Sequence, residues 1–407
     1  MRRIGRLAGT LVLGLGMMGA TTFGQGPPPP PPMPPPPPMP GQPFPNLTKA
    51  EMALLQAGKA AFLQPQSVSE GLGPVFNETS CVQCHGGSQG PVGSSGLELV
   101  TRFGRIVNNE FDPMVEFGGP AIQAKGIGRF NGVNFVGEVV PHQATIVAQR
   151  RTIPLFGLGL VDAVPDSALM ALSTYQHQTS PATAGVVCMV VDEATGLERV
   201  GRFGWKAQHA TLFSFVGDAY LNELGITTPL FPAENAPQGN SALLAANPAK
   251  TNPNDLDVDS IQQITNFLTL TAPPVPPPGP LNSNQKAGQT LFGLIGCAQC
   301  HQPTLQAGPS STRPINGAMF APYSDFLLHD MGPLGDGIVQ GTAGPTLMRT
   351  APLWGLQFEK TYLHDGRAST IDAAIRAHAG QGATAAHNYG TLNATQKAQL
   401  LGFLNSI

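Results

Sequence analysis

Apolar residues recur at the spacing of an α-helix in four parts of the chain. The first helix is expected to begin after Thr48, because Glu51 three residues later completes the pattern of a capping box, and Leu55 and Phe62 then share one face. Two of the expected helices lead toward a cysteine motif, and the other two close the stretches that follow those motifs. The four helices are expected within residues 46–62, 257–270, 282–296 and 392–407.

The cysteine motifs read "CVQCH" and "CAQCH" and lie far apart in the chain. Two thiols at this spacing, followed directly by histidine, are the attachment signal of a c-type haem, in which the histidine becomes the proximal iron ligand. Zinc ribbons and thioredoxin-like pairs use similar spacings, but zinc favours a second Cys/His pair nearby and a thioredoxin motif follows a strand. We therefore predict two covalently bound c-type haems, attached through Cys81 and Cys84 and through Cys297 and Cys300, with His85 and His301 as proximal ligands.

Proline-rich runs divide the chain, because proline lacks the N–H group that helices and sheets need. Between them, the order of helix, haem motif, long glycine-rich middle and closing helix occurs twice. This repeat predicts a mostly α fold of two tandem cytochrome c-like haem domains with long loops. The expected segments are a signal peptide (1–25), a proline-rich linker (26–46), the first haem domain (47–271), a second linker (272–281) and the second haem domain (282–407).

The N-terminus has the pattern of an export signal. Basic "MRRIGR" precedes the apolar stretch "LAGTLVLGLGMMGA", which predicts a signal peptide and a periplasmic protein. An uncleaved leader that acts as an anchor is the alternative. No later run of about 20 apolar residues occurs, so we expect no stable membrane insertion.

Charge and the fifth cysteine narrow the partners further. Charged residues make up 12% of the 407-residue chain, the net charge is −3, and no basic run is present, so we expect no nucleic-acid partner. Cys188 lies outside both haem motifs. It is expected to be a small buried residue, and a reactive thiol is the alternative.

Five further motifs carry a family resemblance. They are "RRTIPLFGLGLVDAVPDSAL", "GRFGWKA", "LLHDMGPLGDG", "RTAPLWGL" and "YLHDGRASTIDAAIRAHAG". Together they resemble the bacterial di-haem oxidoreductases, a family described as peroxidases and sometimes labelled thiol oxidoreductases, which is similar to di-haem cytochrome c peroxidases and to the di-haem enzyme of methylamine utilisation. The resemblance covers residues 48–407.

The resemblance implies a distal ligand for the second haem. In di-haem peroxidases this ligand is usually a methionine at a fixed distance beyond a "Y-F-H-x-G" motif, and the same distance from "YLHDG" leads here to His378. The stretch "TIDAAIRAH" is expected to be one helix with His378 on its buried face. The alternative is a helix-end histidine that interacts only with the helix dipole. Three methionines are reserve ligands: Met319, Met331 and Met348.

The same comparison implies an open first haem. Thr101 stands where the peroxidases place a distal histidine, and the position that corresponds to His378 in the internal repeat falls near Ala219. We expect a five-coordinate or water-bound iron, as a peroxide site needs, although His142 or His209 is an alternative ligand. Glu223 resembles the acid–base glutamate of the related enzymes, and the alternative is a solvated surface residue.

Four other residues belong to the shared motifs. Trp205 and Trp354 are expected either to relay electrons between the haems or to pack in the core. His364 and Arg367 match the family motif, and Arg367 is a candidate partner of a haem propionate.

The implied function is reduction of hydrogen peroxide at the first haem, with electrons passed through the second from a small cytochrome c or cupredoxin. A non-enzymatic di-haem electron carrier is the main alternative, and oxidative modification of a protein partner is another. A histidine in place of methionine is expected to lower the potential of the second haem. Related peroxidases hold calcium, but no acidic cluster in this sequence demands it.

Overall fold

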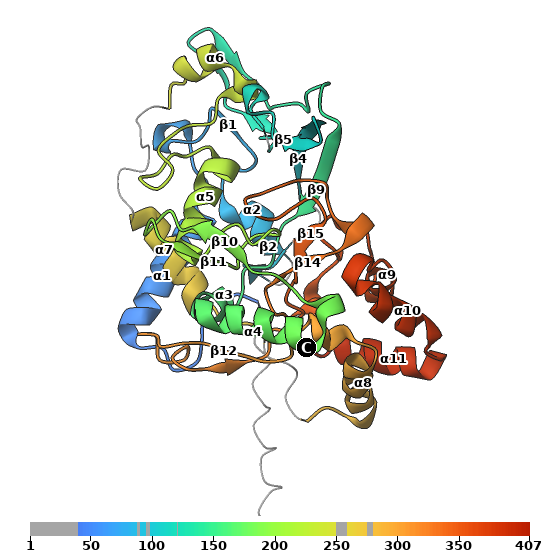
Figure 1. The fold of residues 1–407 in the computed structure, drawn as a ribbon. Coiled ribbons are helices and arrows are strands. Elements are labelled where there is room, and N and C mark those ends of the chain that lie inside the picture. Colours follow the sequence, from blue (N-terminus) through green and yellow to red (C-terminus); the bar gives the residue numbers. More distant parts are fainter. Residues whose placement is uncertain (1–39, 88–89, 95–97, 120, 250–258, 275–279) are drawn as a thin grey trace, which may run out of the picture. The chain divides into compact units, whose positions relative to one another are not determined.

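A computed structural model describes residues 40–87, 90–94, 98–119, 121–249, 259–274 and 280–407 (Figure 1). All described residues belong to one compact unit of the chain. The predicted signal peptide and most of the first linker lie outside the described residues. Within the described part of the chain, no helix is both long and apolar enough to span a membrane.

The four helices expected before the cysteine motifs and at the ends of the two halves are present as α1, α7, α8 and α11. Helix α1 begins with the predicted capping box, in which Thr48 accepts from the backbone N–H of Glu51 and the Glu51 carboxylate accepts from that of Thr48. Helix α1 packs along α7, and α8 packs along α11 (Figure 1). The α-helices described are α1 (Lys49–Leu63), α2 (Cys81–His85), α3 (Leu158–Asp162), α4 (Asp166–Thr179), α5 (Leu212–Leu224), α6 (Ser241–Ala245), α7 (Asp259–Leu270), α8 (Ser283–Leu294), α9 (Ile371–Arg376), α10 (Ala383–Thr391) and α11 (Ala394–Leu404).

The crossing of α1 and α7 depends on a glycine. A Cβ atom on Gly58 would lie 2.0 Å from the carbonyl oxygen of Gln263, so only glycine lets the two backbones approach this closely. One turn further along α1, the ring of Phe62 packs against that of Phe267 with centroids 5.2 Å apart. The helix that precedes the first cysteine motif is therefore fixed to the helix that closes its half of the chain.

The crossing of α8 and α11 repeats this arrangement residue for residue. A Cβ atom on Gly288 would lie 2.1 Å from the carbonyl oxygen of Gln399. One turn later, the rings of Phe292 and Phe403 pack with centroids 5.7 Å apart. The internal repeat expected from the sequence is thus present in the packing of the two helix pairs.

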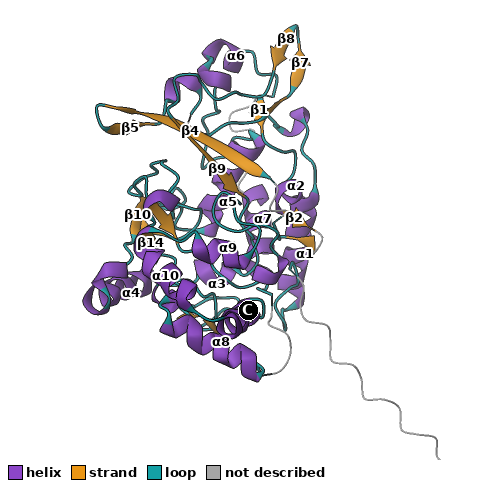
Figure 2. Cartoon of the chain, turned by 90° about the vertical axis from the view of Figure 1, so that its right-hand side faces the viewer, coloured by secondary structure: helices purple, strands orange, loops and turns teal. Residues whose placement is uncertain are grey.

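Strands form a larger part of the structure than the sequence suggested (Figure 2). The longest belongs to a three-stranded antiparallel sheet of order β5-β4-β9, in which Leu99 pairs with Arg151 and Gly104 with Ile146. The strands described are β1 (Val75–Phe76), β2 (Gly86–Gly87), β3 (Gly90–Pro91), β4 (Leu99–Val107), β5 (Glu110–Asp112), β6 (Lys125–Gly126), β7 (Gly128–Phe130), β8 (Val133–Phe135), β9 (Ile146–Arg151), β10 (Cys188–Val191), β11 (Glu198–Gly201), β12 (Leu305–Gln306), β13 (Met319–Phe320), β14 (Leu328–Asp330) and β15 (Leu347–Arg349).

The expectation of a mostly α fold made of two tandem cytochrome c-like domains is therefore wrong. The long middle segments contain small antiparallel sheets, in which two-residue turns join β4 to β5 and β7 to β8, while pairs such as β4 with β9 join strands far apart in the chain. The largest buried cluster also combines residues from both halves. It contains Phe62 and Phe267 from the first half together with Phe320 and Trp354 from the second.

Candidate functional site

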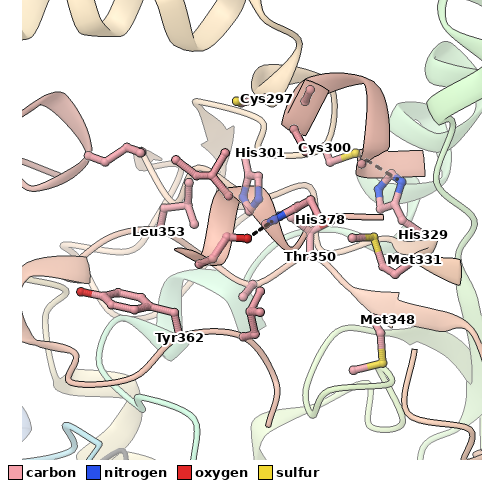
Figure 3. Close-up of a pocket in the computed structure, with 18 of the residues that line it drawn as sticks. Cys297, Cys300, His301, His329, Met331, Met348, Thr350, Leu353, Tyr362 and His378 are labelled. Atoms are coloured by element: carbon pink, nitrogen blue, oxygen red, sulfur yellow. Dashed lines mark hydrogen bonds between the residues drawn. The ribbon is translucent and has the colours of Figure 1, made fainter. Parts of the chain in front are cut away.

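The second cysteine motif opens onto a cavity of about 390 Å³. Cys297 begins a one-turn 3₁₀ helix (Cys297–Gln299) directly after α8, and Cys300 and His301 follow it. The wall also includes Phe292 of the α8–α11 crossing and His378, which follows α9 (Figure 3). The chain thus places the motif and the predicted distal histidine around one hollow.

The rings of His301 and His378 are neighbours in this cavity, with centroids 6.4 Å apart and planes inclined by 58° (Figure 3). Two imidazoles that bind one ion from opposite sides, each with a nitrogen at about 2 Å, have ring centres on the order of 6 Å apart. The observed separation therefore suits two ligands of a single metal. Helix α9 ends two residues before His378, so the observed helix is shorter than the one predicted from the sequence.

The hydrogen bonds of both rings leave the same nitrogen free. Nδ1 of His301 donates to the carbonyl oxygen of Tyr323 at 2.9 Å, and Nδ1 of His378 donates to that of Ala374 at 2.8 Å. A carbonyl oxygen only accepts, so Nε2 carries the lone pair in each neutral ring. Burial, with His378 nearby, lowers the pKa of His301 to about 4, and burial lowers the pKa of His378. Both rings are thus neutral, as metal ligands must be.

His329 is a functional candidate that the sequence reading did not select. Its Nε2 lies 2.9 Å from the buried carboxylate of Asp325, and its Nδ1 lies 3.4 Å from Sγ of Cys300 (Figure 3). Burial opposes its charged form, but Asp325 raises the pKa of His329 to about 10. Of the reserve ligands, Met331 and Met348 line the cavity, whereas Met319 is 63% exposed on β13.

The first cysteine motif forms the short helix α2 beside another cavity, of about 160 Å³. We call this one the first cavity and the cavity at the second motif the second cavity. Nδ1 of His85 donates to the carbonyl oxygen of Ile153 at 3.0 Å, which again leaves Nε2 for a metal. Burial lowers the pKa of His85 to about 4, so this ring is neutral as well. His85 therefore presents a free Nε2 at the first motif, as His301 does at the second.

Helix α5 forms another wall of this first cavity, with Asp218, Ala219 and Glu223 on its lining. Among the described residues that line the cavity, His85 is the only histidine and none is a methionine. His142 is exposed, and His209 is buried outside the lining, so neither alternative ligand is brought to this cavity. The two cavities thus differ in the ligands that face the motif histidine.

Glu223 presents a carboxyl group near the end of α5, on the wall of the first cavity. Burial raises its pKa to about 7, and its carboxylate accepts a hydrogen bond from Nδ2 of Asn77 at 2.9 Å. Its backbone carbonyl also accepts from the N–H of Asn77, which ties the end of α5 to the segment before α2. Glu223, chosen from the sequence, lines the cavity beside the first cysteine motif.

Three arginines on the first cavity were not selected from the sequence. Arg102 comes from β4, and Arg150 and Arg151 end β9, so the three-stranded sheet brings all of them to one wall. Arg150 pairs with the buried carboxylate of Asp336, which also lies 3.0 Å from Nζ of buried Lys206. Guanidinium groups at such a wall suit the carboxylates of a propionate-bearing cofactor. For two of these arginines, Arg150 and Arg151, the sequence signal was the "RR" pair that opens the first family motif.

The two cavities share a wall. Trp205 and Arg151 line both, and Nε1 of Trp205 donates to the carbonyl oxygen of Arg151 at 2.9 Å. The ring of His364 meets Trp205 edge-on with centroids 6.3 Å apart and faces the second cavity. Trp354 lines the second cavity but not the first, and its ring packs against that of Phe320.

Arg367 is the one predicted site residue that the structure places on neither cavity. Its side chain is 51% exposed and donates to the carboxylate of Asp365. Among the described residues, no group of three or more His, Cys, Asp or Glu side chains is arranged to hold a bare metal ion. The side chains near the motifs instead fit a haem at each, because each motif offers two cysteines and a half-buried imidazole whose Nε2 is available.

The sequence matches the family model described as "Di-haem oxidoreductase, putative peroxidase" over residues 132–407. The chain therefore belongs to the di-haem oxidoreductase family, as the shared motifs predicted. The match includes the second cysteine motif, and the first motif precedes it. Membership assigns the chain a di-haem redox role as an oxidoreductase. No curated protein matches the sequence.

Solved structures show distant likenesses. The di-haem peroxidase BthA of Burkholderia thailandensis is 14% identical with a TM-score of 0.40, over 90% of this chain and 86% of that one. Hydrazine synthase of Kuenenia stuttgartiensis is 14% identical with a TM-score of 0.37, over 98% and 100% of the two chains. A MauG-like protein associated with microbial copper homeostasis is 17% identical with a TM-score of 0.32, over 62% and 88%.

Proposed function

We propose that this protein is a periplasmic c-type di-haem enzyme that reduces hydrogen peroxide in the first cavity with electrons that enter through the second. One contrast carries the proposal. The described lining of the first cavity offers His85 and no second histidine or methionine, whereas His301 faces His378 across the second. An enzyme that binds peroxide at one haem and stores electrons at another needs this asymmetry.

In the second cavity, the chain's residues hold a cofactor on both sides. His301 and His378 would bind it through Nε2, and their hydrogen-bonded Nδ1 atoms fix the orientation of each ring. A cofactor held by both histidines would supply electron transfer in this cavity and would not bind a substrate.

In the first cavity, His85 would hold the cofactor from one side and Glu223 would handle protons. A carboxyl group with a pKa near 7 can accept a proton from peroxide and return it to the departing oxygen at neutral pH. The haems, when bound, supply the two electrons that peroxide reduction consumes. The three arginines and Gln208 add polar groups to the same wall.

The shared wall gives electrons a short route between the cavities. Trp205 contacts both, and its hydrogen bond to Arg151 fixes the indole in place. The external donor is proposed to be a small cytochrome c or cupredoxin. The N-terminal export pattern and the haem motifs support a periplasmic location, because c-type haem is attached outside the cytoplasm.

The test is peroxide turnover by holoprotein matured in a host that attaches c-type haem. We expect peroxide to be reduced with a small redox protein as donor, and Glu223→Gln to lower kcat by about 10²- to 10⁴-fold while both haems stay attached. Glu198→Gln, on an exposed strand residue, is the control and should turn over like the wild type. Holoprotein that transfers electrons but reduces no peroxide would instead establish the non-enzymatic carrier.

A further inference from the structure

We propose that Glu193, His209 and Asp218 form a proton path from the protein surface into the first cavity. The proposal rests on the proposed peroxide reduction, which consumes two protons together with two electrons for each peroxide. Glu223 can move a proton within the cavity, but the protons that end in water must come from solvent. The structure holds a chain of titratable side chains that reaches from solvent to the cavity wall.

His209 is the centre of the path. Its side chain is 5% exposed, and its backbone carbonyl accepts from the N–H groups of Arg202 and Phe203, which fixes the segment just before α5. Nε2 lies 3.3 Å from Oδ2 of Asp218, and Nδ1 lies 3.7 Å from Oε2 of Glu193. Nδ1 is buried without a hydrogen-bond partner, so a small movement of Glu193 completes the contact.

Asp218 is the inner end of the path. It lies on α5 one residue before Ala219, and its side chain lines the first cavity. Nδ2 of Asn222, one turn later, donates to Oδ1 at 2.8 Å, which leaves Oδ2 to face His209. A proton that reaches Asp218 is therefore at the cavity wall, on the same helix as Glu223.

Glu193 is the outer end of the path. It follows β10 in the turn that leads to β11, and its side chain is 32% exposed. The neighbouring Asp192 is fully buried and accepts hydrogen bonds from the hydroxyl groups of Thr211 and Ser214 at the start of α5. These bonds fasten the turn to the helix, so Glu193 stays close to His209 while it reaches solvent.

The electrostatics agree with this geometry. Burial opposes a charge on His209, but the carboxylates of Asp218 and Glu193 raise its pKa to about 9. Burial likewise opposes ionisation of Asp218, yet the imidazolium beside it and Arg102 lower its pKa. His209 is thus held as a charged proton store, although it takes no part in the ligand sets of either cavity.

The transfer moves protons only. The Nε2–H bond of charged His209 breaks as its proton passes to the Asp218 carboxylate, and the carboxyl group so formed gives that proton to the cavity. The neutral ring keeps its Nδ1 proton, a tautomer change moves that proton to Nε2, and the free Nδ1 then accepts a proton from solvent through Glu193. Two such transfers supply the two protons that one peroxide consumes.

The experiment uses holoprotein and the variants Glu193→Gln and Asp218→Asn, which keep side-chain size and remove the titrating group. We expect both to lower kcat by about tenfold or more with little change in KM, and an added small acid such as imidazolium to restore kcat in the Glu193 variant. Glu198→Gln, on the other strand of the same hairpin, is the matched control and should behave like the wild type.

A second readout does not depend on turnover. In an NMR pH titration of the holoprotein, His209 should ionise well above the ordinary histidine value of about 6.5, and Asp218→Asn should lower that pKa. Variants with wild-type kcat and an unshifted His209 titration would overturn the path while leaving peroxide reduction in place. Wild-type holoprotein that reduces no peroxide would overturn both proposals.

Discussion

The imidazole rings of His301 and His378 lie 6.4 Å apart, centroid to centroid, on the wall of the second cavity. Each ring donates its Nδ1 proton to a backbone carbonyl oxygen, so the two free Nε2 atoms are available to one metal. In the first cavity the described lining gives His85 no such partner. The following predictions test this difference and the packing that supports it.

Replacing His378 by methionine is expected to raise the midpoint potential of the second haem. A thioether favours ferrous iron more than an imidazole does, so the increase should be on the order of 0.1 V, within the roughly 0.8 V range that axial ligands span. A spectroscopic redox titration of the wild type and His378→Met measures it. An unchanged potential would mean that His378 is not a ligand.

Replacing Gly288 by alanine is expected to destabilise the protein by about 1–3 kcal/mol. The added Cβ would lie 2.1 Å from the carbonyl oxygen of Gln399, and the overlap outweighs the roughly 1 kcal/mol that alanine gains over glycine in a helix. Thermal or urea unfolding measures the change. Gly293→Ala in the same helix meets nothing within 4 Å and should be neutral or stabilising. Equal effects of the two substitutions would contradict the close crossing.

Replacing Asp336 by asparagine is expected to cost about 3–5 kcal/mol. The Asp336 carboxylate is fully buried between Arg150 and Lys206, and its loss leaves two buried cations without their counter-charge. Arg376→Gln breaks an exposed pair on α9 and should change stability by less than about 1 kcal/mol. Unfolding of both variants in urea gives the comparison, and a mild effect of Asp336→Asn would show that the pair is solvated.

Glu223 is expected to make stability fall as the pH rises. Its folded-state pKa is raised to about 7 from an ordinary 4.5, so the folded protein favours the protonated form. This contribution is complete below pH 4.5 and is lost as the pH rises through 7. Melting temperatures of wild type and Glu223→Gln between pH 4.5 and 8 test it, and the variant should lose less stability across that window. Parallel curves would contradict the buried carboxyl.

The helix pairs and the cofactor motifs could be predicted from the sequence because their signals are local. The capping box at Thr48 and the apolar face of α7 need no knowledge of the rest of the chain. The hairpins were missed although turn signals were present. Asn108 and Asn109 both have positive φ between β4 and β5, and Asn131-Gly132 joins β7 to β8.

The site residues also fall into two groups, those that a local sequence signal reveals and those that only the fold brings to the cavity. Trp205 stands in a motif shared with the family, Glu223 resembles the acid–base glutamate of the related enzymes, and both line the first cavity. Asp218 and Arg102 carry no motif of their own, and only the packing of α5 and β4 brings them to that cavity. Arg367 illustrates the reverse case, because a motif residue can still point to solvent and pair with its neighbour Asp365.

Electron paramagnetic resonance of the oxidised holoprotein, recorded beside His378→Ala, tests the central claim most directly. The account predicts one low-spin ferric signal from the haem between His301 and His378 and one high-spin signal from the haem on His85. The alanine variant should lose the low-spin signal and keep the other. Two low-spin signals in the wild type, or a low-spin signal that survives in the variant, would contradict the account.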